Sequence, residues 1–169
     1  MTWKNHKFAT LAVVYAGTGS LAASFIAATS SLLPDLLELR GVVPHRTVTH
    51  YPYPFILAAG VFWYLLSVDP GYAYYAAFFA SVGVLLHIVQ DGLSVGGVPL
   101  VTPGGRRIGA KLYVTRAPSE WMVVVYILGG CLLVAAARGF LSPAYLQYSA
   151  VLAAEMGLNF VKTVGGSLP

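Results

Sequence analysis

Imidazole, guanidinium and hydroxyl groups are concentrated in one short stretch of an otherwise apolar chain, residues 44–50, with the sequence Pro-His-Arg-Thr-Val-Thr-His. This stretch holds two of the four histidines, and the other two are His6 and His87. On a helix His87 shares a face with Asp91, because residues four apart are neighbours. Imidazole nitrogens and carboxylate oxygens are zinc ligands, and a catalytic zinc site keeps one position for water. The spacing therefore predicts a metal site.

Carboxylates complete the predicted set of ligands. Asp35 follows Pro34 at the end of the first apolar region, and Glu120 opens a later one. We predict that some subset of six residues binds the metal: His6, Asp35, His45, His50, His87 and Asp91. Zinc is the expected ion and manganese the alternative. The set suffices for one ion, or for two about 3.5–4 Å apart.

Three further residues are predicted to act on a substrate. Glu120 would be an added ligand or the general base. Arg46 carries a guanidinium that binds phosphate in a forked geometry, and with Thr47 or Thr49 it would hold an anionic group as charge develops. A metal would lower the pKa of bound water towards about 7. A single histidine at a membrane interface is usually only solvated, but four histidines and three carboxylates on one side favour a site.

The composition is that of an integral membrane protein. Hydrophobic residues make up 57% of the chain and charged residues 9%, whereas soluble domains carry about 25% charged residues. The length of 169 residues predicts one domain, 1–169. A single cysteine, Cys131, excludes a disulfide framework and is expected to be a small core residue. The basic start leads into an apolar run without a clear cleavage site, so we expect it to be retained.

The expected fold is an all-α, polytopic membrane helical bundle. Residues 8–33 are uncharged and could form one span. The Gly-Thr-Gly-Ser sequence at 17–20 is a turn signal, and it predicts instead a hairpin of two short helices, about 3–16 and 20–33. Four transmembrane helices are predicted to follow, over residues 51–68, 72–90, 120–137 and 143–161, with a Gly- and Pro-rich loop over 91–119.

The basic residues favour the hairpin, because cytoplasmic loops carry an excess of Lys and Arg. With a hairpin, the N-terminus, the 34–52 loop, the 91–119 loop and the C-terminus share one side. That side then holds nine of the ten basic residues, with Arg138 opposite: Lys4, Lys7, Arg40, Arg46, Arg106, Arg107, Lys111, Arg116 and Lys162. A single helix would instead place seven basic residues on this side and three on the opposite side. The hairpin also places the four histidines, Asp35, Asp91 and Glu120 on this side, which is predicted to be cytoplasmic.

In its order of motifs the chain resembles the YdjM-type family of membrane-bound, metal-dependent hydrolases, some of them described as LexA-regulated. The matching pieces span residues 5–121, about two thirds of the chain: Asn5-His6, Leu32-Leu33-Pro34-Asp35, His45-Arg46-Thr47-Val48-Thr49-His50, His87-Ile88-Val89-Gln90-Asp91-Gly92-Leu93, residues 97–103 and Ser119-Glu120. The resemblance implies a metal-dependent hydrolase of the bacterial inner membrane with an N-terminal helical hairpin.

One position departs from the family pattern. Family members often carry a second carboxylate two places after the first, and this chain has Leu37 there, with Glu38 next to it. The departure predicts an altered set of metal ligands and leaves the second ion open. More remotely, the ligand types and the His-x-x-x-Asp helix are similar to those of zinc-dependent phospholipase C and related nucleases, which is an analogy of site alone.

The predicted function is hydrolysis of a phosphoester or phosphodiester in a lipid or other anionic substrate at the cytoplasmic membrane face. Loop cations around the site favour a phosphorylated lipid: Arg106, Arg107, Lys111 and Arg116. A nucleic acid held by its backbone charge is less favoured, and no specific nucleic acid is expected. The alternative, which Leu37 favours, is a non-catalytic subunit or adaptor with a structural metal, in a homo-oligomer or larger membrane complex. Metal transport is disfavoured because the polar residues gather on one side.

Overall fold

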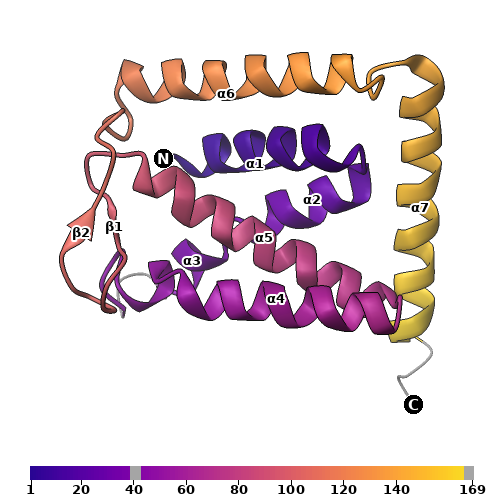
Figure 1. The fold of residues 1–169 in the computed structure, drawn as a ribbon, viewed down its shortest axis with the longest axis horizontal. Helices are drawn as coiled ribbons and strands as arrows, with labels where there is room; N and C mark the ends of the chain where they lie inside the picture. The colour runs from indigo at the N-terminus through magenta and orange to yellow at the C-terminus, as the bar shows by residue number, and fades with distance from the viewer. Residues whose placement is uncertain (39–42, 166–169) are drawn as a thin grey trace.

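The first apolar region folds into a helical hairpin, as its central turn signal predicts. In the computed structural model, which describes residues 1–38 and 43–165, α1 (Trp3–Thr18) and α2 (Leu21–Ser30) run side by side (Figure 1). Between them Gly19 has a φ of +69°, a left-handed conformation that favours glycine. The Ser20 side chain accepts a hydrogen bond from the backbone N–H of Ala23 and caps α2. The predicted hairpin is confirmed.

Two short helical turns follow at the end of the hairpin where the chain began. Pro34 lies in the first turn of α3 (Leu33–Leu36), where its missing N–H has no helical partner to lose. The 3₁₀ helix η2 (Val48–His50) belongs to the histidine-rich stretch. The residues between the two turns include Arg40, which lies outside the described residues.

The remaining chain forms one long helical hairpin, a small pair of strands and two further helices. The helices α4 (Tyr53–Val68) and α5 (Tyr72–Gly92) are joined by a tight turn and pack together. The loop after α5 contains two antiparallel strands, β1 (Val98–Pro99) and β2 (Arg107–Ile108), which the sequence did not predict. Two helices follow, α6 (Pro118–Ala137) and α7 (Pro143–Gly165).

Two helices of the described chain, α5 and α6, are long and apolar enough to cross a membrane. The predicted span over α4 has 16 residues, about 24 Å at 1.5 Å per residue, against a hydrocarbon core of about 30 Å. The fourth predicted span, α7, lies across the far ends of α4, α5 and α6 (Figure 1). A helix in that orientation cannot cross the same bilayer alongside them, so four parallel spans are not supported.

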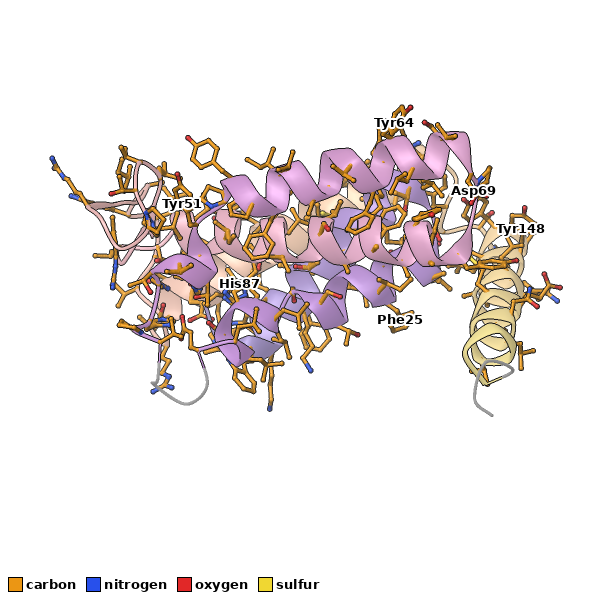
Figure 2. All side chains as sticks on the ribbon, turned by 90° about the horizontal axis from the view of Figure 1, so that it is seen from below. Phe25, Tyr51, Tyr64, Asp69, His87 and Tyr148 are labelled. Atoms are coloured by element: carbon orange, nitrogen blue, oxygen red, sulfur yellow. The ribbon has the colours of Figure 1, made fainter. Side chains whose placement is uncertain are left out.

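The position of α7 also changes the predicted distribution of charge. It lies at the end of the molecule opposite α3 and the β strands (Figure 1), so the chain does not return to that side within the residues up to 165. The side chain of Lys162 lies outside the described residues. Arg138 lies at the opposite end as predicted, where its Nη1 donates to the carbonyl oxygens of Ala16 and Gly17 at the end of α1. Figure 2 shows the same polarity, with His87 and Tyr51 at one end and Asp69 at the other.

Close packing between α2 and α5 sets the position of the second histidine helix. Gly83 lies against the backbone of Ala27, and a Cβ at Gly83 would come within 2.8 Å of the Ala27 Cα. Small residues allow such a close approach of two helices. His87 follows Gly83 by about one turn of α5, so this contact fixes its imidazole against the hairpin.

Candidate metal centre

The predicted metal ligands converge at one end of the bundle from four separate elements. His6 comes from α1, Asp35 from α3, His50 from η2, and His87 and Asp91 from α5. The three histidine side chains have no exposed surface and that of Asp91 has 2%. Burial of this many ionisable groups is costly unless they are paired or coordinate a metal.

Four ligand atoms surround one point. The Nε2 atoms of His50 and His87 lie 3.0 Å apart. The His50 Nε2 lies 3.5 Å from both Asp35 Oδ1 and Asp91 Oδ2. The His87 Nε2 lies 3.6 Å from Asp35 Oδ1 and 3.8 Å from Asp91 Oδ2. For zinc bonds of 2.0–2.2 Å, the ligand atoms of a tetrahedron are about 3.4 Å apart. These five separations, 3.0–3.8 Å, lie around this value, so the four residues are close enough together to share one ion.

Hydrogen bonds to His6 fix which of its nitrogens is free. The Gln90 Nε2 donates to Thr10 Oγ1 at 3.0 Å, so its Oε1 is left to accept from His6 Nδ1 at 2.7 Å. The lone pair is then on His6 Nε2, which lies 3.3 Å from Asp91 Oδ1 and has no hydrogen-bond donor. Asp35 Oδ1 is likewise buried without a donor. Buried acceptors that face one another without donors are typical of a site for a cation or an ordered water.

Glu38 is the site residue that the sequence did not assign. Its Oε2 lies 2.7 Å from His45 Nδ1, and its Oε1 accepts from the Thr49 hydroxyl at 3.2 Å and lies 3.3 Å from His50 Nδ1. These acceptors favour a proton on His50 Nδ1 and a lone pair on Nε2, facing the ligand cluster. The signal for Glu38 was its spacing, because it follows Asp35 by three residues and so shares its face.

The expected loss of a carboxylate at Leu37 is therefore corrected. Leu37 continues the helical winding of α3 and is 51% exposed, whereas Glu38 is 8% exposed and points into the site. The chain carries its second carboxylate one position later than the family pattern.

The ligands form two adjoining groups with no residue in common. One contains His6, His87 and Asp91, and the other contains Asp35, Glu38, His45 and His50; within each group, one atom per residue lies within 4.8 Å of the others. All six predicted ligands are thus brought together. Burial alone would raise the pKa of Asp35, but the nearby His87, together with the charge of His50, lowers it below its ordinary value. Asp35 is accordingly a carboxylate at neutral pH.

Arg46 is anchored inside the site. Its Nη2 lies 2.9 Å from Asp91 Oδ2, and its Nη1 donates to Ser94 Oγ at 3.0 Å and approaches the Gly97 carbonyl oxygen at 3.4 Å. The guanidinium passes against Gly96, where a Cβ would collide with Nη1. Arg46 therefore orients Asp91, and only a glycine at position 96 allows it to do so.

Glu120 lies apart from the ligand groups in the described part of the chain. Its carboxylate accepts hydrogen bonds from Thr2 N and Oγ1, from Asn5 Nδ2 and from the backbone N–H of Arg116, at 2.6–2.9 Å. Both oxygens are thus used to join the start of α6 to the start of α1. This geometry favours a role in positioning His6 on α1 over the predicted role of ligand or base.

A cavity of about 750 Å³ gives access to the centre. Metal ligands and cations share its wall: Asp35, Glu38, His45, Asp91, Arg46, Arg107 and Arg116. Arg107 Nη2 donates to the carbonyl oxygen of His45 at 2.8 Å, and the Met1 amino group lies 2.7 Å from Asp91 Oδ1. The centre can therefore bind a divalent cation on its buried side and an anionic group on its open side.

Comparisons with known proteins agree with this organisation. The family model described as YdjM inner membrane protein matches residues 1–163. The searches of curated proteins and of solved structures found no match.

Proposed function

The chain belongs to the YdjM inner membrane protein family, and we propose that it is a membrane-bound, metal-dependent hydrolase. Its substrate would be a phosphoester or phosphodiester of a lipid or other anionic molecule at the cytoplasmic membrane face. Zinc is the proposed ion, with manganese as the alternative.

One observation carries the proposal. Nitrogen and oxygen acceptors of His50, His87, Asp35 and Asp91 meet at 3.0–3.8 Å, and this cluster adjoins a cavity that also exposes arginines. A purely structural centre would have every ligand position closed by protein, whereas a catalytic one keeps an approach for water and substrate.

Each residue of the site is assigned a role from its contacts. His50, His87, Asp35 and Asp91 would hold a single ion. Two ions would be divided between His6, His87 and Asp91 on one side and Asp35, Glu38, His45 and His50 on the other. When bound, the metal supplies a Lewis acid and a nucleophile from water at neutral pH. Arg46 keeps Asp91 oriented from the cavity wall. Arg107 and Arg116 would attract the phosphoryl oxygens, since guanidinium matches them in geometry and charge.

The proposed cytoplasmic orientation is supported by the basic residues at the site end. Lys4 and Lys7 on α1 lie at this end together with the cations of the 91–117 loop, while Arg138 lies at the other. The excess of Lys and Arg on cytoplasmic loops supports a site that faces the cytoplasm.

The decisive experiment measures metal content and turnover together. Detergent-solubilised protein would be compared with His50→Ala and Asp91→Asn by elemental mass spectrometry, and then assayed on phospholipids and on a water-soluble phosphodiester. Ser81→Ala is the control, because its hydroxyl on α5 bonds only the Ala77 carbonyl oxygen of its own helix. We expect about one or two ions per chain in the wild type and the control, with turnover lost in both site variants. Metal-free protein after reconstitution, or turnover in both variants, would refute the proposal.

A structural metal in a non-catalytic membrane subunit is the second candidate. It is supported by the origin of the ligands, since an ion here would tie α1, α3, η2 and α5 together. A metal that stabilises the fold in protein without turnover on any phosphoester would select this alternative.

A further inference from the structure

An apolar groove lies between α1 and α6, beside the polar cavity. It has a volume of about 470 Å³, within the range of ligand sites. Leu11 and Tyr15 line it from α1, and Val125, Gly129 and Leu132 line it from α6. The two helices lie side by side and both start at the metal end (Figure 1).

One face of α1 connects the cavity to the groove. Trp3, Lys7, Leu11 and Tyr15 follow one another at intervals of four residues, so they form one stripe along the helix. Trp3 lines the polar cavity, and Leu11 and Tyr15 line the groove. Lys7 is exposed between them. The stripe therefore runs from aromatic to cationic to apolar along the length of the helix.

The wall formed by α6 also changes from polar to apolar along its length. Arg116 lines the cavity two residues before α6 begins. Trp121 is exposed one turn before Val125, where the groove starts. Exposed tryptophans at this level are typical of the boundary between headgroups and hydrocarbon. Both walls thus change from charged to apolar at the same end of the helix pair.

We propose that the groove binds an acyl chain of an anionic phospholipid whose phosphate lies in the polar cavity. The position of the phosphate in the polar cavity rests on the proposed function. The groove adds that the substrate is a membrane lipid. Leu11 lies about 12 Å and Tyr15 about 18 Å along α1 from Trp3. An acyl chain in one leaflet extends about 15 Å, half of a hydrocarbon core of about 30 Å. The groove begins at Leu11, within the depth that such a chain reaches, and continues beyond that depth at Tyr15. Lys7, Arg107 and Arg116 complement the phosphate charge.

Two adjacent glycines allow a matched test. Gly129 lines the groove and Gly130 does not, yet a Cβ at either position would meet no atom within 4 Å. Leucine at either site also improves helix propensity. Gly129→Leu therefore fills the groove, and Gly130→Leu adds the same side chain outside it.

The experiment is photo-crosslinking in vesicles that contain phosphatidylglycerol with a diazirine on its acyl chain. Crosslinked residues would be mapped by peptide mass spectrometry in the wild type, Gly129→Leu and Gly130→Leu. We expect crosslinks on the groove residues, loss of these crosslinks in Gly129→Leu, and retention in Gly130→Leu. The same diazirine on phosphatidylcholine should crosslink more weakly, because its headgroup carries no net charge.

Each contrary outcome has a defined meaning. Crosslinks spread evenly over the outer face of α4, equal labelling by both lipids, or crosslinks between two copies of the chain would overturn the lipid groove. Groove crosslinks without turnover would leave the lipid site standing and refute only the hydrolase. Turnover of a water-soluble phosphodiester without groove crosslinks would support the hydrolase and refute the lipid site.

Discussion

Glu38→Gln is expected to weaken metal binding about 10–100-fold, the usual effect of losing a residue that orients a metal ligand. The carboxylate contacts four groups of the histidine-rich stretch. Its Oε2 lies 2.7 Å from His45 Nδ1, and its Oε1 lies 3.0 Å from the Arg46 backbone nitrogen, 3.2 Å from Thr49 Oγ1 and 3.3 Å from His50 Nδ1. Each is a donor or can become one.

Glutamine keeps the shape of this side chain but only one of its acceptor oxygens. In one orientation its NH₂ group would face His45 Nδ1, and in the other it would face the Arg46 N–H and the Thr49 hydroxyl. At least one hydrogen bond to a charged group is lost either way, at a cost of about 1.5–3 kcal/mol. A 10–100-fold loss of affinity corresponds to about 1.4–2.7 kcal/mol, so the contacts account for the expected magnitude.

The assay is competition for zinc against a chelator series, with metal content read by elemental mass spectrometry. Leu37→Gln is the matched control, because it places the same amide on the neighbouring, half-exposed side chain. If Glu38→Gln bound zinc as tightly as the wild type, or if Leu37→Gln weakened binding as much, the assignment of Glu38 to the site would be refuted. Loss of a whole ion per chain would identify Glu38 as a direct ligand.

Three further outcomes are expected from the geometry. Gly96→Ala should displace the Arg46 guanidinium and lower turnover about 10²-fold with unchanged metal content, whereas Gly92→Ala, whose added Cβ makes an ordinary 3.6 Å contact, should leave turnover intact. Gln90→Leu removes the hydrogen bond that fixes the His6 tautomer, and it should weaken zinc binding about 10–100-fold in the same chelator competition. Chelation should lower the melting temperature by about 5–10 °C, since metal at 100 times its Kd adds about 2.7 kcal/mol and each kcal/mol shifts a chain of this size by about 2–4 °C. An unchanged melting temperature in metal-loaded protein would contradict a site that joins four elements.

The ligands could be predicted from the sequence because ionisable residues are rare in so apolar a chain. His6, His45, His50 and His87 are all of its histidines, and each lies at an end of an apolar segment or in a loop. The helical hairpin was predictable for a similar reason, because glycine and serine interrupt an uncharged run only where the chain turns.

The direction of α7 could not be predicted from composition. Among the described helices α7 is long enough but not apolar enough to be a candidate span, and this low hydropathy does not say where the helix lies. Its position is set by tertiary contacts that are distant in sequence. The Ser149 hydroxyl donates to the Gly19 carbonyl oxygen and accepts from the Leu21 N–H, and so binds α7 to the turn of the hairpin. The role of Glu120 in joining α6 to α1 could not be predicted for the same reason, because its partners Thr2 and Asn5 lie more than 110 residues away in the sequence.

Leu37 and Glu38 show why the spacing of a motif must be interpreted through the backbone. Two carboxylates separated by one residue lie on the same side of an extended segment, whereas in a helical turn the matching separation is three residues. Here the residues after Asp35 keep a helical conformation, with Leu37 at φ −69° and ψ −12°. A carboxylate at position 37 would therefore point away from the centre, and one at 38 points into it. The local conformation thus places Glu38 with Asp35, His45 and His50 in a group that could hold a metal ion.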